Sequence, residues 1–188
     1  MEIPKIIFIT GLPSTGKTTL SKMLSAELHL PLIGKDTIKE MMFDTVGYSD
    51  REWSKKIGYS SYEIMYYIAE EEIKAGRTII LESNFKRLEN SKRFQELQIE
   101  YNFEALQIVC YGDPEVLFNR FKTRAESGNR HKGHDDVNNM DEHAEVFRNE
   151  KSEPLDIEGD VIWVETNDFS TVDNAKLLQA AKEFSKAA

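Results

Sequence analysis

The chain has 188 residues, which suits one domain with a small lid but is too short for two full domains. Hydrophobic residues make up 40% of it, enough for one sizeable core, so a wholly disordered chain is excluded. The net charge of −9 disfavours broad, sequence-blind binding to duplex nucleic acid or to anionic membranes.

Cysteine usage and apolar runs bear on the compartment. The one cysteine, Cys110, cannot form an internal disulfide, which fits a reducing environment. The apolar run at 6–9 is too short for a signal peptide, and no stretch approaches the ~20 apolar residues of a membrane-spanning helix. We therefore expect a cytoplasmic protein with no membrane partner.

Short apolar runs alternate with longer segments in which apolar residues have helical spacing. The expected strands cover 6–10, 31–34, 77–82, 105–111 and 161–165. The expected helices cover 17–28, 37–43, 51–74 with a break near Gly58, 88–101, 114–127, 140–151 and 172–187. This alternation predicts a single α/β domain over residues 1–188, with a doubly wound, five-stranded parallel sheet.

The strongest motif is GLPSTGKT at 11–18, which matches G-x-x-x-x-G-K-[ST] between a predicted strand and a predicted helix. Glycines let the backbone curl around a phosphate, and the following helix adds the positive end of its dipole. Lys17 is expected to reach the outer phosphates, and the hydroxyl of Thr18 to bind Mg²⁺. The residues expected to hold the nucleotide here are Gly11, Pro13, Ser14, Thr15, Gly16, Lys17, Thr18 and Thr19. ATP is favoured over GTP because the chain has no Asn-Lys-x-Asp run.

With this loop near the start of a short chain, the sequence resembles the small P-loop kinases of the polynucleotide kinase, chloramphenicol phosphotransferase and zeta-toxin-like group. The resemblance implies a nucleoside/nucleotide kinase-like fold and ATP and Mg²⁺ as cofactors. It also implies a helical insertion at about 45–75 that covers the acceptor, and a lid at about 120–139.

Asp36 follows the second predicted strand, where this group has the general base that takes the proton of the acceptor hydroxyl. Ligands of open α/β sheets bind at the carboxyl ends of strands, so a carboxylate there can orient a hydroxyl. The alternative is that Asp36 only caps the next helix. Lys39 matches an arginine that contacts the acceptor in this group, where a lysine would act as a point charge. The alternative is that Lys39 is an ordinary solvated lysine.

Glu82 ends the third predicted strand and resembles the Walker B acid, which would bind Mg²⁺. The group more often has aspartate there, so the longer glutamate leaves direct or water-mediated contact open. The alternative is an exposed carboxylate on a turn. Asn84 begins the next loop and is expected to line the acceptor pocket. Helical spacing relates Tyr59, Tyr62 and Tyr66, which either line the same pocket or pack on the domain as one helix face.

Residues 117–134 carry five Lys and Arg side chains against one acid in an otherwise acidic chain. Arg120 and Arg124 are four residues apart and therefore share a helix face. They resemble the lid arginines that close over ATP and stabilise charge during transfer. Arg130 lies in a loop with two glycines that would let it swing as a lid. The alternative is ordinary pairing with surface acids.

His131 and His134 lie in the same loop, near Asp135, Asp136 and His143. These residues would be an unusual zinc site, because structural zinc sites have thiolates or a closed set of four ligands. The alternatives are that the histidines donate hydrogen bonds to phosphate or to the acceptor, or that they have no specific role. Asn167, after the fifth strand, resembles the position that contacts adenine.

Together these features predict an ATP- and Mg²⁺-dependent kinase that phosphorylates a hydroxyl of a small molecule. The residues expected to act in transfer are Lys17, Asp36, Arg120, Arg124 and Arg130. Three alternatives stay open: an ATP-binding switch or ATPase that acts on a protein partner, a polynucleotide 5′-hydroxyl kinase, and a toxin-like kinase of a cell-wall sugar nucleotide. The acidic charge makes a nucleic acid the less favoured acceptor.

Overall fold

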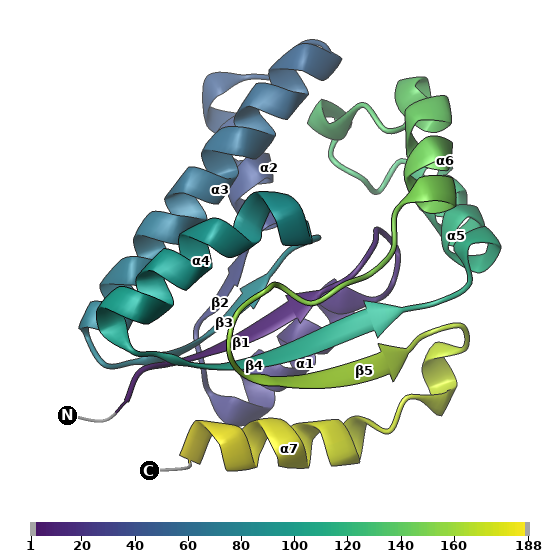
Figure 1. The fold of residues 1–188 in the computed structure, drawn as a ribbon. Coiled ribbons are helices and arrows are strands. Elements are labelled where there is room, and N and C mark those ends of the chain that lie inside the picture. Colours follow the sequence, from purple (N-terminus) through teal and green to yellow (C-terminus); the bar gives the residue numbers. More distant parts are fainter. Residues whose placement is uncertain (1–2, 187–188) are drawn as a thin grey trace.

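A computed structural model describes residues 3–186 as a five-stranded sheet with helices on both faces (Figure 1). The strands are β1 (Lys5–Thr10), β2 (Leu32–Gly34), β3 (Thr78–Glu82), β4 (Glu104–Tyr111) and β5 (Asp160–Glu165). The α-helices are α1 (Lys17–Leu28), α2 (Lys35–Val46), α3 (Arg51–Lys74), α4 (Arg87–Tyr101), α5 (Pro114–Glu126), α6 (Met140–Asn149) and α7 (Asn174–Lys186). Three short 3₁₀-helices are η1 (Lys132–His134), η2 (Val137–Asn139) and η3 (Phe169–Thr171).

All neighbouring strands run parallel, in the order β2-β3-β1-β4-β5. β1 lies in the centre of the sheet. The chain first adds β2 and β3 next to one edge of β1, and then adds β4 and β5 next to its other edge. Ligands of such sheets bind at the carboxyl ends of the strands, where the direction of winding changes beside β1. The predicted doubly wound α/β fold is thus confirmed.

Apolar side chains of β1 are buried on both faces of the sheet. Ile6 and Phe8 face α3 and α4, where the ring of Phe94 meets Phe8 edge to face at 4.8 Å between centroids. Ile7 and Ile9 face α1 and α7. A central parallel strand is covered on both sides, which explains why its sequence is a continuous apolar run.

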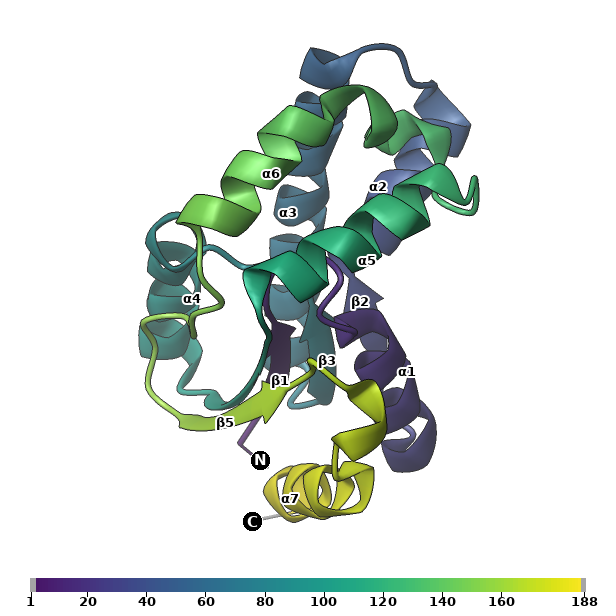
Figure 2. The ribbon, with the colours of Figure 1, turned by 90° about the vertical axis from the view of Figure 1, so that its right-hand side faces the viewer.

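Two helical arms stand on the carboxyl-terminal edge of the sheet (Figures 1 and 2). One arm is α2 with the N-terminal half of α3, and the other is α5 with α6. Arg51 of α3 joins the arms through two hydrogen bonds to Glu142 of α6, at 2.7 and 3.0 Å. A further link is made where the ring of His131 stacks on Phe43 of α2 at 5.2 Å. The arms therefore enclose the space above the sheet edge.

Helix α3 continues without a break through Gly58, so the predicted interruption is wrong. Its N-terminal half packs on α2, and its C-terminal half packs on the sheet through Met65 and Ala69. Tyr66 is buried, whereas Tyr59 is 69% exposed, so the tyrosines of this helix do not share one packed face. The error at Gly58 arises because burial against a neighbouring helix outweighs the weak helix propensity of glycine.

Other element boundaries agree with the sequence prediction to within a few residues. Helix α2 begins at Lys35, two residues earlier than predicted, and the segment predicted as a loop at 128–139 holds η1 and η2. Asp50 caps α3 by accepting a hydrogen bond from the N–H of Trp53 at 2.8 Å. The predicted end of the last helix, at Ala187, lies outside the described residues. Within residues 3–186, no helix is long and apolar enough to cross a membrane.

Candidate active site

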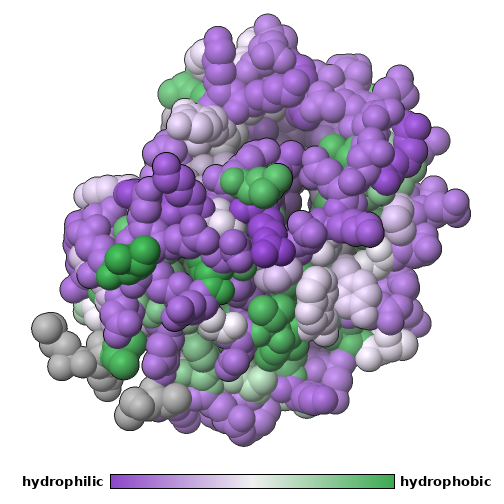
Figure 3. All heavy atoms as spheres, in the orientation of Figure 1, coloured by the Kyte–Doolittle hydropathy of each residue, from purple (hydrophilic) through white to green (hydrophobic). Residues whose placement is uncertain are grey.

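A cavity of about 540 Å³ lies between the two arms at the carboxyl-terminal edge of the sheet. Figure 3 shows that the surface around the hollow between the arms is mostly hydrophilic. Eight cationic side chains line the cavity: Lys17, Lys22, Lys35, Lys39, Arg51, Arg120, Arg124 and Arg130. Four acids accompany them: Asp36, Glu40, Glu82 and Asp136. The excess of positive charge suits an anionic ligand such as a nucleotide.

The backbone of the loop at 11–18 adopts conformations that favour glycine. Gly11 has φ 144°, Gly16 has φ 79°, and Ser14 has φ 63°. A Cβ on Gly11 would lie 2.1 Å from the carbonyl oxygen of Cys110, so no larger residue fits there. The buried Nζ of Lys17 donates a hydrogen bond across the loop to the carbonyl of Leu12 at 2.9 Å. The loop is therefore closely wound, as a phosphate cradle requires.

Not every residue of this loop faces the cavity. The lining residues are Pro13, Ser14, Gly16, Lys17, Thr18 and Thr19. Gly11 and Thr15 do not line this cavity: Gly11 borders a second, adjoining cavity, and the hydroxyl of Thr15 donates to the carbonyl of Leu12 at 2.8 Å. The hydroxyl of Ser14 is buried without a hydrogen-bond partner in the described part of the chain, so it is free to bond a phosphate oxygen. These features fit a nucleotide.

Glu82 is buried at the end of β3, so the exposed-turn alternative is wrong. Its carboxylate accepts a hydrogen bond from the hydroxyl of Thr18 at 3.4 Å. Burial raises the pKa of Glu82, and the nearby Lys17 only partly offsets this. No lysine or arginine within residues 3–186 forms an ion pair with Glu82. A hydroxyl beside a buried, unpaired carboxylate supplies the oxygen ligands that Mg²⁺ takes, so the pair fits that ion.

Asp36 is the second residue of α2, and Gly34 occupies the N-cap, so the capping alternative is wrong. Its carboxylate accepts hydrogen bonds from the Nζ of Lys35 at 3.1 Å and from Arg130 at 2.8 Å. Burial would raise the pKa of Asp36, but Lys35 and Arg130 outweigh burial and hold that pKa well below its usual range. The carboxylate is therefore ionised at neutral pH.

Arg130 is the centre of the contact between α2 and the segment after α5. Besides Asp36, it contacts Glu40 at 3.4 Å, Asp136 at 3.2 Å and the Nδ1 of His134 at 3.1 Å. Because an arginine can only donate, this Nδ1 accepts, and the Nε2 of His134 carries the proton that bonds Glu40 at 2.8 Å. Burial lowers the pKa of His134, which agrees with a neutral ring.

Arg120 and Arg124 both line the cavity from α5, as their spacing predicts, but their surroundings differ. Arg120 donates to the carbonyls of Thr166 and Asn167, each at 2.5 Å. Arg124 forms no ion pair within residues 3–186, and its Nε is buried without a partner. Burial and then the nearby Arg130 lower the pKa of Arg124. Neither arginine pairs with surface acids, and Arg124 is the one available to an anion.

Asn167 uses its side chain to join two loops rather than to line the cavity. Its Oδ1 accepts from the backbone N–H of Asp113 at 2.6 Å, and its Nδ2 donates to Glu165 at 2.6 Å. The neighbouring ring of Phe169 lies against the phosphate loop, because a Cβ on Gly16 would be 2.2 Å from it. Sequence analysis missed Phe169, and no local pattern marks it.

Asp36, Lys39 and Asn84, which were predicted to bind the acceptor, line the cavity, whereas Tyr59, Tyr62 and Tyr66 do not. Lys39 is 6% exposed and donates to the hydroxyl of Ser54 at 2.9 Å, so it is not a solvated lysine. Asn84 lines the cavity, and its carbonyl accepts from the hydroxyl of Tyr62 at 3.3 Å. Lys35 was missed, although its place beside Asp36 in the sequence was a usable signal.

His131 lies outside the cavity and contacts Asp44 of α2 at 3.1 Å, whereas His134 lines the cavity. Across the described range 3–186, no three or more His, Cys, Asp or Glu side chains are grouped so that they would hold a metal ion. These histidines instead attach the segment after α5 to α2.

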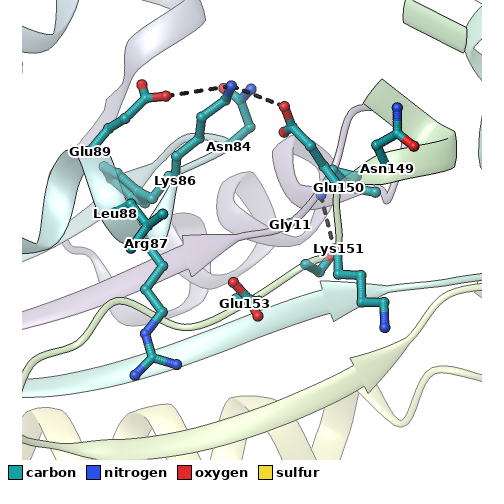
Figure 4. A pocket seen from close by; sticks show the side chains of 13 residues that line it. Gly11, Asn84, Lys86, Arg87, Leu88, Glu89, Asn149, Glu150, Lys151 and Glu153 are labelled. Carbon is teal, nitrogen blue, oxygen red and sulfur yellow. Dashed lines mark hydrogen bonds and ion pairs between the residues drawn. The ribbon is translucent and has the colours of Figure 1, made fainter. Parts of the chain in front are cut away.

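A second cavity, of about 380 Å³, adjoins the first at Asn84 and lies between the start of α4 and the chain after α6 (Figure 4). Its charged lining is balanced: Lys86, Arg87 and Lys151 against Glu89, Glu150 and Glu153. Lys86 is paired with Glu150 at 3.0 Å and with Glu89 at 3.6 Å. The first cavity is therefore the better site for a polyanion.

Comparison with known proteins identifies the family. A family model described as an AAA domain, AAA_33, matches residues 6–147. The crystal structure of a candidate kinase from Chloroflexus aurantiacus J-10-fl has a TM-score of 0.89 and 36% identity, covering 97% of this chain and 98% of that one. A search of curated proteins finds no match.

Two more distant structures show the fold alone. An APS kinase from Mycobacterium tuberculosis, in complex with AMPPNP and APS, has a TM-score of 0.60 and 10% identity over all of both chains. A sugar kinase from Janibacter sp. HTCC2649 has a TM-score of 0.53 and 12% identity over 96% of this chain and 92% of that one. From the match over 6–147 and the likeness to the Chloroflexus protein, the chain belongs to the AAA_33 family of AAA domains.

Proposed function

We propose that the protein is an ATP- and Mg²⁺-dependent kinase that phosphorylates a hydroxyl of a small molecule. One observation carries the proposal: the ionised carboxylate of Asp36 opens onto the same cavity as Lys17 and Thr18 of the phosphate loop. A hydrolase needs only to place water, whereas a kinase needs a group that orients an acceptor beside the phosphates. The kinase-like fold supports this reading.

The phosphate side of the cavity binds the nucleotide in this proposal. ATP supplies the phosphoryl group, and a bound Mg²⁺ would offset charge on the phosphates. Lys17 and Arg124, which has no ion pair within residues 3–186, bind phosphate oxygens, and Thr18 with Glu82 would hold the metal ion. These side chains are already positioned in the folded protein, so they hold the phosphates in a fixed orientation for transfer.

The α2 side of the cavity serves the acceptor. Asp36 accepts a hydrogen bond from the acceptor hydroxyl, aims its oxygen at the phosphorus, and takes the proton as the new O–P bond forms and the bond to the leaving ADP oxygen breaks. Arg130 fixes the orientation of Asp36 and keeps it ionised. The segment that carries Arg130 also covers the site, which excludes water that would compete with the acceptor.

A polynucleotide 5′-hydroxyl is a second candidate acceptor, as in one branch of the group that the sequence resembles. The excess of cations in the cavity favours it. The net charge of −9 opposes it, because a longer polyanion would also meet the acidic surface outside the cavity. We therefore favour a small molecule.

The test is transfer of label from γ-labelled ATP, with Mg²⁺, to a panel of nucleosides, sugars, aminoglycosides, chloramphenicol-type drugs and 5′-hydroxyl oligonucleotides. Label should appear on one class. Asp36→Asn should keep nucleotide affinity and lose about 100-fold or more in transfer, whereas Lys17→Ala should lose transfer through the phosphate loop. Asp141→Asn, on the exposed face of α6, is the matched control. Label found only as free phosphate, at a rate that no acceptor changes, would instead favour an ATPase switch.

A further inference from the structure

Strand β5 lies at the edge of the sheet, and its two faces have different surroundings (Figure 1). Ile108 and Cys110 of β4 and Val164 of β5 pack with α1 and α7 on one face. Because side chains alternate along a strand, Tyr111 and Trp163 point to the other face. There Tyr111 is 39% exposed and Trp163 is 53% exposed. Two large aromatic side chains therefore share one solvent-exposed face.

The two rings form the corner of a pocket. Their centroids are 5.8 Å apart and their planes cross at 76°, so two ring faces meet at nearly a right angle. The pocket has a volume of about 530 Å³, and its other walls include Leu12 of the phosphate loop, Pro114 of α5 and the segment 150–153. Leu12 and this segment are joined, because the N–H of Leu12 donates to the hydroxyl of Ser152 at 3.1 Å. A pocket of this size, with walls from several segments, suits a small free molecule better than a protein surface.

Carboxylates lie beside this aromatic corner. Glu153 lines the pocket, and Glu165 follows Trp163 on the same face of β5, where it is the register partner of Tyr111. Glu165 accepts a hydrogen bond from the amide of Asn167, but neither acid forms an ion pair within residues 3–186. The faces of aromatic rings also carry negative partial charge. The corner therefore favours a cation over an anion.

The other charged side chains of the lining nearly cancel. Glu150 is paired with Lys86 at 3.0 Å, and Lys151 is an exposed cation that weakens the attraction for a second one. A metal ion would need several oxygen ligands, whereas the corner offers two ring faces. An organic cation, which surrounds its charge with apolar groups, matches both the rings and the acids.

We propose that the corner between Tyr111 and Trp163 binds a small organic cation, namely a quaternary or methylated ammonium ion. Ring faces attract a cation without accepting conventional hydrogen bonds, so methyl groups in place of N–H groups suit them. Glu153 supplies the opposite charge. Different residues line the active-site cavity, so this site adds to the proposed kinase function and does not depend on it.

Binding is measured on the full chain through the indole N–H signals of its two tryptophans. Choline is titrated into ¹⁵N-labelled protein, and so, separately, is 3,3-dimethylbutan-1-ol, which has the same shape without the charge. The signal of Trp163 should shift and saturate with choline. The signal of Trp53, on α3, is the internal reference and should not move. Choline should bind at least tenfold more tightly than the neutral alcohol.

Isothermal titration calorimetry then compares variants of exposed or half-exposed side chains, which should fold as the wild type does. Trp163→Leu keeps an apolar side chain but removes the ring, and should weaken choline binding at least tenfold. Tyr67→Leu removes an exposed ring of α3 and should leave that binding unchanged. Glu153→Gln should weaken choline binding about two- to fivefold, and Lys151→Gln should strengthen it by a similar factor.

Three results would overturn the proposal: a Trp163 signal that choline does not move, equal affinities for choline and the neutral alcohol, or choline binding to Trp163→Leu as tight as to the wild type. Butylammonium, which mimics a lysine side chain, is the last probe. If it binds more tightly than choline, the proposal is also wrong, because the corner would then suit a side chain of a protein partner.

Discussion

The guanidinium of Arg130 donates a hydrogen bond to the carboxylate of Asp36 at 2.8 Å, although 94 residues separate the two in the sequence. This contact ties the segment after α5 to the helix that carries the proposed base. It also stabilises the ionised form of Asp36. Closure of the segment and the charge of the base are therefore linked through one side chain.

Arg130→Gln should release the segment at 128–139 from α2. The variant loses the ion pairs to Asp36 and Glu40 of α2, which hold this segment in place, and the ion pair to Asp136 within the segment. Amide hydrogens of η1 should exchange about tenfold faster or more, as measured by hydrogen–deuterium exchange. Arg148→Gln, on the surface of α6, should have no such effect. Unchanged protection of η1 would show that other contacts hold the segment.

Arg120→Ala should mainly lower stability, whereas Arg124→Ala should mainly lower phosphoryl transfer. Arg120→Ala removes two hydrogen bonds to the carbonyls of Thr166 and Asn167, and should lower the free energy of unfolding by about 1–3 kcal/mol. Arg124→Ala removes a half-buried cation that has no ion pair within residues 3–186, and should leave stability equal or higher while transfer falls about 100-fold. Urea unfolding and the labelled-ATP assay separate the two. Equal loss of stability would contradict the assignment.

Glu82→Gln should raise the Mg²⁺ concentration needed for half-maximal transfer by about tenfold or more. Burial raises the pKa of Glu82, so the ionised carboxylate opposes folding at pH values above its unfolded pKa. The neutral amide should therefore not lower the free energy of unfolding at pH 7. A Mg²⁺ titration and urea unfolding check both effects, with the exposed Glu96→Gln on α4 as control. An unchanged Mg²⁺ dependence would remove Glu82 from the metal site.

Lys39 should make the free energy of unfolding rise between pH 7 and pH 9.5. Burial and Lys35 lower its pKa from 10.5 to about 8, so between these values the unfolded chain holds a proton that the folded chain has lost. Stability therefore increases with pH, here by on the order of 1–3 kcal/mol. The difference in unfolding free energy between the wild type and Lys39→Met should narrow as the pH rises. Lys56→Met should keep the wild-type slope, and a constant difference would refute the depressed pKa.

Local features of the chain were predicted well because their causes are short-range. The motif at 11–18 is contiguous, and its glycines have the positive φ values that a tight loop needs. The break predicted at Gly58 was wrong because burial against α2 is a long-range effect.

The sequence by itself determined the α/β class, the phosphate loop and the group of candidate side chains, since periodicity and motif spacing act over a few residues. Only the tertiary structure decided which of them are available for chemistry. Arg120 is bonded to backbone carbonyls and Arg124 is not, although both sit on one helix with the same spacing. That distinction depends on burial and on partners more than 40 residues away, as with Thr166. Folding sets such distances through the packing of the whole chain.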